Sequence, residues 1–497
     1  MFKRLLTSIF VTGAAYTASA QQLIGLTTNN YVSVNQLQLN PAYVNNARVA
    51  PEFNLFSISA LAGNNLYTIS SDWALGGFKD DYVVEGKQFK RILDDKRKKA
   101  WVNLDITGPA FSFTYKKKYQ FGVYTRFRTI VNAGNIEGKT FDIWFDSTNY
   151  EHFHHSIKFD KAGASVHAFG EIGISVGKML YEDDMYKLSG GITIKYLMGF
   201  AAANLYTKNM SYQLDNDTVV YVNGDLAGMY TYNATPNGTG DLSQRAGKGS
   251  LGFDIGVNYH FFPDGDPNTE IPYRLNVAAS ITDLGSVSYV GDAGSAKYQV
   301  SAGKNNVHDY EFSSTDDNEP AYYLSRQIIN KNITQKDKAE KFKIGLPTAF
   351  RLNTDYNFGS GLYMSINTLI NLRGNGASVY KPSYISYINF TPRIDIYRSI
   401  KFAVPFTLHR YKDLTMGAIV YLGPLYVGSN SLSSLFFSQQ FKNIDVFAGM
   451  GLRFISRARD NSRTFDNAYD EQRESFFRRL VPGFLRGEKG IACPPKH

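Results

Sequence analysis

Tyr124, Arg126 and Arg128 occupy every second position of one segment, which places all three on one face if the segment is a β-strand. The planar guanidinium group binds carboxylates through paired hydrogen bonds. The two arginines could therefore face the lumen of a barrel and hold the carboxylate of a ligand such as a fatty acid. The simpler alternative is that they pair with acidic residues of the same protein, for which Glu171 and Asp254 are candidates.

His152, His154 and His155 form the one histidine cluster of the sequence, and imidazole is a common ligand of divalent metals. The only carboxylates at a nearby spacing are Glu151 and Asp160, and no cysteine accompanies them. This donor set does not match the spacing of a zinc site, so we predict no metal ion.

Short motifs of catalysis are missing from the sequence. Gly247-Lys248-Gly249-Ser250 superficially resembles a phosphate-binding loop, but its spacing is wrong and a strand rather than a helix follows it. Scattered Ser, His and Asp residues leave open a hydrolase whose triad is assembled from distant strands. The lack of a nucleophile elbow and of a paired-carboxylate motif favours a protein without enzymatic activity and without a cofactor.

The segment that carries the two arginines is one of many long segments with period-two alternation. Between Leu251 and Phe261 apolar residues alternate with small or polar ones, and segments that begin at Leu188, Tyr273 and Asp445 do the same. Strands of soluble proteins are usually about five or six residues long, whereas a tilted strand needs roughly ten to cross a bilayer. Strand length, aromatic strand ends and a polar opposite face favour a membrane barrel over a soluble β-sandwich.

Composition points to the same class of protein. The 497 residues include 34 Tyr, 35 Phe and 43 Gly, a mixture expected when only every second strand residue meets lipid and aromatics gather at the interfaces. The formal charge of +9 comes from basic residues that are mixed with acids, so we expect no nucleic-acid partner. Cys493 is the only cysteine, which rules out a disulfide within the chain.

The first twenty residues have the order of a secretory signal. Lys3 and Arg4 precede an apolar run from Leu5 to Tyr16, and the small residues Ala18-Ser19-Ala20 follow. This order predicts a signal peptide at residues 1–20 and, together with the barrel pattern, a location in the cell outer membrane.

Connection lengths alternate between long and short, as in outer-membrane barrels with long outside loops and short periplasmic turns. The long polar segments are residues 75–106, 132–164, 201–249, 290–343 and 373–383. Residues 52–74 complete an even total of about fourteen strands. The other expected strands are about 107–116, 119–131, 165–178, 186–200, 250–262, 272–289, 344–357, 362–372, 384–396, 401–409, 413–422, 425–430 and 444–455.

Several segments, taken in order, resemble one family. They are Asn40-Pro41-Ala42, Asp105 to Phe111, Phe121 to Arg128, Gly252 to Tyr259, Ser280 to Gly285, Gly423 to Asn430 and Gly449 to Phe454. Over residues 30–455 the sequence resembles an uncharacterised family of Bacteroidota-type outer-membrane barrels. That family is similar to the long-chain-fatty-acid transporters and to the shuttle barrel of the type IX secretion system.

The resemblance implies a barrel of fourteen strands whose lumen is plugged by an N-terminal hatch. Residues 21–50 would be the hatch, with Asn40, Pro41 and Ala42 at its turn. Pro41 fixes its own φ and disfavours the helical region for Asn40, which suits a rigid turn. We therefore expect an all-β transmembrane antiparallel β-barrel at residues 51–455, with the small hatch before it and a periplasmic tail at residues 456–497.

The tail distinguishes this chain from a simple transporter. Tyr469 to Val481 can form a short helix with Phe476, Phe477 and Leu480 on one side. Such a helix could dock a periplasmic or envelope protein partner or lie on the inner leaflet. A disordered tail is the alternative.

The charged segment Asp80 to Lys99 is expected to be a solvated loop, with outer-membrane lipid and lipopolysaccharide as partners that it could meet. Two functions remain. In the first, the barrel takes up or binds hydrophobic small molecules passively, gated by residues 21–50. In the second, it is a non-transporting structural or accessory subunit of an envelope secretion or surface-export complex.

Overall fold

The computed structural model describes most of the barrel and a short part of the segment before it. The described residues are 34–43, 49–75, 87–116, 118–138, 156–159, 161–215, 218–234, 246–262, 273–292, 294–302, 333–338, 340–373, 381–397, 400–410, 413–436 and 440–455. The predicted signal peptide, the histidine cluster and the tail with Phe476, Phe477 and Leu480 lie outside them.

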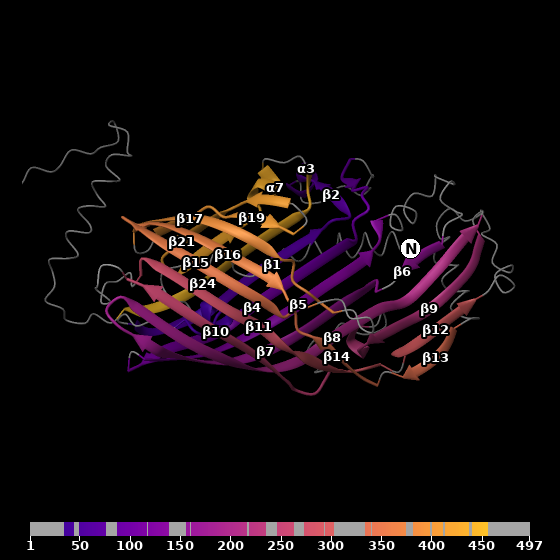
Figure 1. Ribbon diagram of the computed structural model, residues 1–497, viewed down its shortest axis with the longest axis horizontal. Helices are drawn as coiled ribbons and strands as arrows, with labels where there is room; N and C mark the ends of the chain where they lie inside the picture. The colour runs from indigo at the N-terminus through magenta and orange to yellow at the C-terminus, as the bar shows by residue number, and fades with distance from the viewer. Residues whose placement is uncertain are drawn as a thin grey trace, which may run out of the picture.

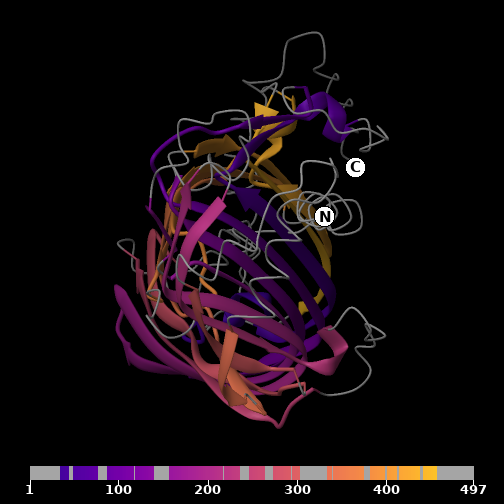
Figure 2. The same cartoon turned by 90° about the vertical axis from the view of Figure 1, so that its right-hand side faces the viewer.

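Fourteen antiparallel strands close into a single barrel, which confirms the predicted fold class. The ring closes because β1 pairs with β4 on one side and with β24 on the other. Figure 2 shows this ring from the side of β6 and β9. In ring order its strands are β1 (Val49–Asn64), β4 (Lys98–Tyr115), β5 (Tyr119–Ile136), β7 (Gly163–Glu182), β8 (Tyr186–Asp215), β10 (Ser250–Phe261), β11 (Leu275–Val290), β15 (Ala349–Gly359), β16 (Leu362–Asn371), β17 (Tyr387–Tyr397), β18 (Ile400–Ala403) continued by β19 (Phe406–His409), β20 (Asp413–Met416) continued by β21 (Ala418–Leu422), β22 (Leu425–Ser429) and β24 (Asn443–Ile455).

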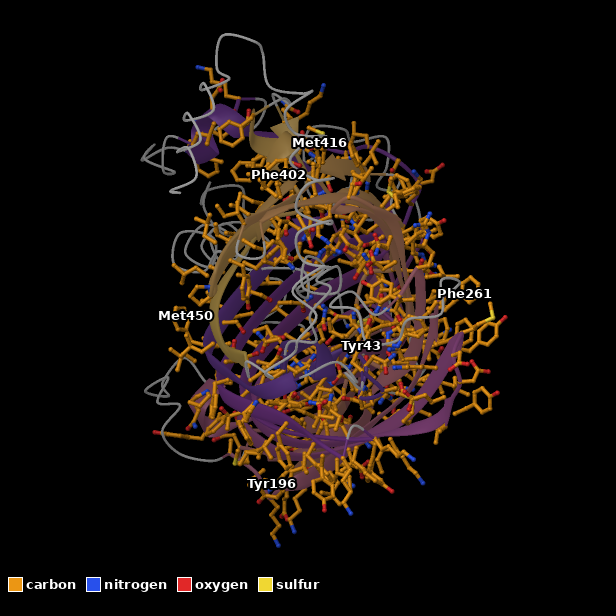
Figure 3. The ribbon with its side chains drawn as sticks, turned by 90° about the vertical axis from the view of Figure 1, so that its left-hand side faces the viewer. Tyr43, Tyr196, Phe261, Phe402, Met416 and Met450 are labelled. Carbon is orange, nitrogen blue, oxygen red and sulfur yellow. The ribbon has the colours of Figure 1, made fainter. Side chains whose placement is uncertain are left out.

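Side chains alternate between a lipid-like exterior and a polar interior, as the sequence pattern predicts. On β10, Leu251 and Val257 are exposed, whereas Asp254 between them is fully buried. Figure 3 shows the same division, because Tyr196 and Met450 project outward from the ring. The outer surface of the barrel is therefore apolar and suited to contact with the lipid of a bilayer. No helix among the described residues is long and apolar enough to cross a membrane.

The strands continue beyond the predicted crossings into segments that the sequence suggested were loops. β4 begins at Lys98, and β8 runs on to Asp215 to pair with β9 (Thr218–Tyr230). The hairpin of β8 and β9 is extended by two more strands, because β12 (Ala296–Ala302) pairs with β9 and β13 (Ile333–Lys338) pairs with β12. In addition, β6 (Ser156–Phe159) pairs with β8. The strand β14 (Lys341–Gly345) pairs with β11. Figure 1 shows β6, β9, β12 and β13 together at one end of the barrel. Polar residues on both faces hide the alternation there, so sequence reasoning missed these strands.

The first predicted crossing, residues 52–74, is wrong at its end. β1 stops at Asn64, whose side-chain oxygen accepts hydrogen bonds from the backbone amides of Leu66 and Tyr67 at 2.8 and 2.6 Å and turns the chain. A small sheet follows outside the ring. It consists of β2 (Tyr67–Ser70), β3 (Phe89–Arg91) and β23 (Gln440–Phe441), with the short helices α3 (Ser71–Leu75) and α7 (Leu432–Phe436) beside it.

Candidate functional site

A short segment, residues 34–43, lies inside the barrel, and we call it the inner segment. It consists of the 3-10 helix η1 (Val34–Gln38) and a turn, and every one of its residues is buried. Figure 3 places Tyr43 within the ring of strands. Burial raises the pKa of Tyr43 to about 12, because the charged phenolate is poorly solvated inside the barrel.

The turn at Asn40, Pro41 and Ala42 is built from side-chain hydrogen bonds. The Asn40 side-chain oxygen accepts from the amide of Ala42 at 2.8 Å. The Asn40 amide group donates to the wall carbonyls of Val257 and Ala279 at 3.0 and 3.2 Å. One asparagine therefore closes the turn and fastens it to β10 and β11 at the same time.

Two glycines form the seat of this turn. Gly191 of β8 and Gly256 of β10 are direct partners in the sheet. A Cβ atom on Gly191 would lie 2.1 Å from the carbonyl oxygen of Pro41, and one on Gly256 would lie 2.1 Å from the side-chain oxygen of Asn40. The wall is thus thinned at the point where the inner segment rests on it.

Further hydrogen bonds tie the inner segment to other parts of the ring. Asn35 donates to Asn54 of β1 at 2.9 Å, and Gln38 donates to Thr107 of β4 at 3.2 Å. The remaining anchors are Ser280 of β11 to the Leu39 carbonyl, Ser189 of β8 to the Ala42 carbonyl, Asn353 of β15 to the Tyr43 hydroxyl and Asn35 to the Tyr426 hydroxyl of β22. The segment therefore spans the bore instead of lying along one wall.

Removing the Asn40 side chain is expected to loosen the inner segment. The Asn40 side chain takes part in three hydrogen bonds that each contribute roughly 0.5–1.5 kcal/mol, so Asn40→Ala should weaken docking by about 1.5–4.5 kcal/mol. Amide exchange of residues 34–43, followed by mass spectrometry, should become faster by on the order of tenfold or more. Asn357→Ala is the matched control, because Asn357 also closes a turn, at Gly359, but away from the inner segment. Unchanged exchange in Asn40→Ala would contradict the role of this side chain.

The predicted arginine face lies inside the barrel and is fully engaged with acidic residues. Arg126 donates through Nε to Asp105 at 2.6 Å, and its Nη1 lies 3.3 Å from Glu171. Arg128 lies 3.4 Å from Glu171 and binds Asp283 through two hydrogen bonds at 2.8 and 3.0 Å. Neither guanidinium is free to receive the carboxylate of a ligand.

Asp254 is not a partner of these arginines, in contrast to the alternative suggested by the sequence. It binds Lys195 at 2.8 Å, and Lys195 also lies 2.8 Å from Asp283. We call the whole set of paired side chains the charged belt. Its members are Asp105, Arg126, Arg128, Glu171, Lys195, Asp254 and Asp283, all of them buried.

Asp283 is the centre of the charged belt, and sequence reasoning did not assign it a role. Its φ is +61°, and a register shift interrupts the neighbouring pairing of β10 with β11. Asp283 also accepts a hydrogen bond from the Tyr384 hydroxyl at 2.8 Å. A signal was present in the sequence, because Gly285 within a strand pattern indicates a bulge.

The charged belt crosses the bore. Arg128 belongs to β5 and Asp283 to β11, although β7, β8 and β10 separate these two strands along the wall. Tyr124 lies next to the belt on β5, fully buried, and packs with Leu37 and Tyr43 of the inner segment. The predicted turn residues and the predicted arginine face are thus joined through Tyr124.

An apolar layer lies on the other side of the charged belt. Along β8, Gly191 seats the inner segment, Lys195 belongs to the belt and Leu197 belongs to the apolar layer. β5 and β7 follow the same order. The buried members of the apolar layer are Ile130, Phe169, Leu197, Ala202, Tyr206, Ala227, Met229, Val287, Tyr289, Phe342, Ile344 and Leu346. Among the described residues, no group of three His, Cys, Asp or Glu side chains could hold a metal ion.

Comparison with known families covers most of this barrel. Residues 41–430 match the model of a family of unknown function, DUF5723. The chain belongs to this family. The matched residues begin at Pro41 and include the two seat glycines and the whole charged belt.

Solved structures with a similar barrel include bacterial channels. The toluene transporter TbuX of Ralstonia pickettii shows 10% identity and a TM-score of 0.40, over 88% of this chain and 99% of that chain. The toluene transporter TodX of P. putida shows 8% identity and a TM-score of 0.40, over 88% and 98%. A FadL homologue of Pseudomonas aeruginosa shows 8% identity and a TM-score of 0.30, over 88% and 98%. No curated protein matches the sequence.

Proposed function

We propose that this protein is an outer-membrane barrel that binds small hydrophobic molecules and lets them pass inward, with residues 21–50 as its gate. The observation that carries the proposal is the order of layers in the bore: an apolar layer, the charged belt and then the inner segment. The apolar layer would receive the ligand, and the inner segment would control its passage.

The apolar layer is unusual for the inside of a large membrane barrel, because such interiors are polar. Val287 and Tyr289 are at most 1% exposed on the inward face of β11, and Phe169 of β7 is fully buried. Apolar side chains with a few polar groups beneath them are the kind of surface that small-molecule sites present, and this supports the proposal.

The inner segment has the properties of a gate. Its anchors to the wall are mainly single, uncharged hydrogen bonds, each of which contributes only about 1 kcal/mol. Such contacts can be exchanged for water when the segment moves. The segment can therefore close the bore at rest and leave it without breaking the charged belt.

The second candidate function is a non-transporting subunit of an envelope secretion or surface-export complex, such as the type IX system. The belt favours this candidate, because its paired charges join β5 and β11 across the bore. In this case the outside loops or the tail, with Phe476, Phe477 and Leu480, would bind a protein partner.

A binding measurement separates the two functions. Full-length protein in lipid nanodiscs would be titrated with decanol by calorimetry, and we expect saturable binding. Val287→Thr adds a hydroxyl to the apolar layer with little change of volume and should weaken binding about tenfold. Val257→Thr, on the outward face of β10, is the matched control and should bind as the wild type does.

Two results would overturn the uptake proposal. One is that decanol does not bind the wild-type protein. The other is that Val287→Thr and Val257→Thr bind it equally well. A stoichiometric protein partner that co-purifies in mild detergent and is lost on deletion of residues 456–497 would favour the second function.

A further inference from the structure

Eight lysine and arginine side chains are buried in the described part of the barrel and its rim, and seven of them are paired with carboxylates. The paired ones are Lys98, Arg126, Arg128, Lys187, Lys195, Arg393 and Lys401. The eighth is Arg351 of β15, which is 3% exposed and forms no ion pair with any carboxylate of the described residues. Arg351 is therefore the exception that requires an explanation.

The neighbours of Arg351 are uncharged. Its Nε donates to the hydroxyl of Thr282 at 3.3 Å, and it shares a side-chain hydrogen bond with Tyr387. Its guanidinium carbon lies 5.8 Å from the centre of the Tyr384 ring. These contacts orient the guanidinium group but do not neutralise it.

An unneutralised guanidinium group is expensive to bury. Arginine does not lose its proton in proteins, so the charge stays. Burial of an unpaired charge costs several kcal/mol, unless an opposite charge or several strong hydrogen bonds compensate it. The structure thus holds a cation that is prepared for an anion.

The surroundings of Arg351 define the kind of anion. Ala349, Leu369, Tyr384 and Tyr387 form a buried apolar cluster, and the guanidinium group of Arg351 contacts two of its members, Tyr384 and Tyr387. Two residues further along the same face of β15, Asn353 donates to Tyr43 of the inner segment. The free cation therefore lies between an aromatic surface and the gate, where a molecule that is apolar except for one anionic group would fit.

We propose that Arg351 binds the carboxylate of an otherwise apolar ligand, with the hydroxyl of Tyr387 beside it. The inference deepens the proposed function and rests on it. The planar guanidinium group can bind both oxygens of a carboxylate at once. The engaged arginines of the charged belt cannot do so without giving up Glu171, Asp105 or Asp283.

Two ligands of equal chain length test the proposal in lipid nanodiscs. Decanoate and decanol would be titrated into the full-length wild type and into Arg351→Gln. We expect the wild type to bind decanoate about tenfold more tightly than decanol, since hydrogen bonds between a guanidinium group and a carboxylate are stronger than those to a neutral hydroxyl. Arg351→Gln should remove this preference, so that it binds decanoate no more tightly than decanol. Arg410→Gln removes an exposed arginine at the end of β19 and should retain the preference.

Further measurements keep the proposal falsifiable. The shift of the folded barrel on unheated gels shows whether Arg351→Gln folds, and Arg351→Lys should restore part of the preference. Acetate that binds the wild type as tightly as decanoate, and not Arg351→Gln, would show a site for free small anions and overturn the proposal of an amphiphile. Equal binding of decanol and decanoate to the wild type would overturn the carboxylate site alone. Binding of neither would overturn the proposed function as well.

Discussion

Replacing Gly191 by alanine is expected to push the inner segment off its seat and open the bore. The new Cβ would lie 2.1 Å from the carbonyl oxygen of Pro41 and 2.3 Å from its carbonyl carbon, and these are backbone atoms that cannot rotate away. Overpacking of this kind costs typically about 1–3 kcal/mol. The cost falls on the closed state alone, so the open population should rise by roughly 5- to 150-fold.

The opening can be measured in two ways. Single barrels in planar bilayers should show a higher conductance or a larger open fraction. Ala42→Cys, made in a Cys493→Ser background, should react faster with a water-soluble maleimide when Gly191→Ala is added, because Ala42 is fully buried in the closed state.

Gly451→Ala is the matched control for this prediction. Gly451 lies in β24, and a Cβ there would meet nothing closer than the Phe53 carbonyl oxygen at 3.7 Å, which is an ordinary contact. Gly256→Ala should give an intermediate effect, since its nearest atom belongs to the Asn40 side chain. Equal conductance and labelling in Gly191→Ala and Gly451→Ala would rule out the seat as the feature that holds the gate.

The wall of the barrel was predictable because a simple physical rule governs each of its residues. Side chains on one face of a strand meet lipid and those on the other meet a polar interior, so the pattern of β10 is already visible between Leu251 and Phe261. The rule fails above the membrane, where both faces meet water. The ends of β8, β9 and β12 were missed for that reason.

The charged belt was predictable only in part. The spacing of Arg126 and Arg128 identifies an inward face, since it depends on strand periodicity alone. Strict alternation would place the side chain of Asp283 on the outward face of β11, together with that of Ile281. Instead, the left-handed backbone conformation at Asp283 turns its side chain inward, so that Asp283 and its neighbour Thr282 are both buried. A bulge shifts every later residue by one position, and this cannot be counted from apolar periodicity.

The seat and the free arginine depend on which strands become neighbours. Gly191 and Gly256 matter because β8 pairs with β10 in a register that places them side by side. Arg351 matters because no carboxylate of the described residues comes within ion-pair distance once β15 joins β11. Neither fact is contained in the local sequence around these residues.

Replacing Asp283 by asparagine is expected to destabilise the barrel strongly. Asp283 binds Arg128 and Lys195, and all three side chains are buried. Asparagine keeps the size of the side chain and tolerates a positive φ, so the substitution removes the charge and leaves the backbone of the bulge intact. Loss of one partner from a buried ion pair costs roughly 3–5 kcal/mol. Urea unfolding of the protein in lipid vesicles should show a fall of this size in the free energy of unfolding.

Asp225→Asn tests whether any carboxylate would have the same effect. Asp225 is paired with Lys336 at 3.4 Å on the surface, and both side chains are more than a third exposed. Its removal should change the free energy of unfolding by about 0.5 kcal/mol or less. Lys195→Met should cost less stability when it is added to Asp283→Asn than it costs in the wild type, because Lys195 has then already lost one of its two carboxylate partners. If Asp283→Asn is as stable as Asp225→Asn, or if Lys195→Met costs as much in Asp283→Asn as in the wild type, the charged belt does not hold β5 to β11.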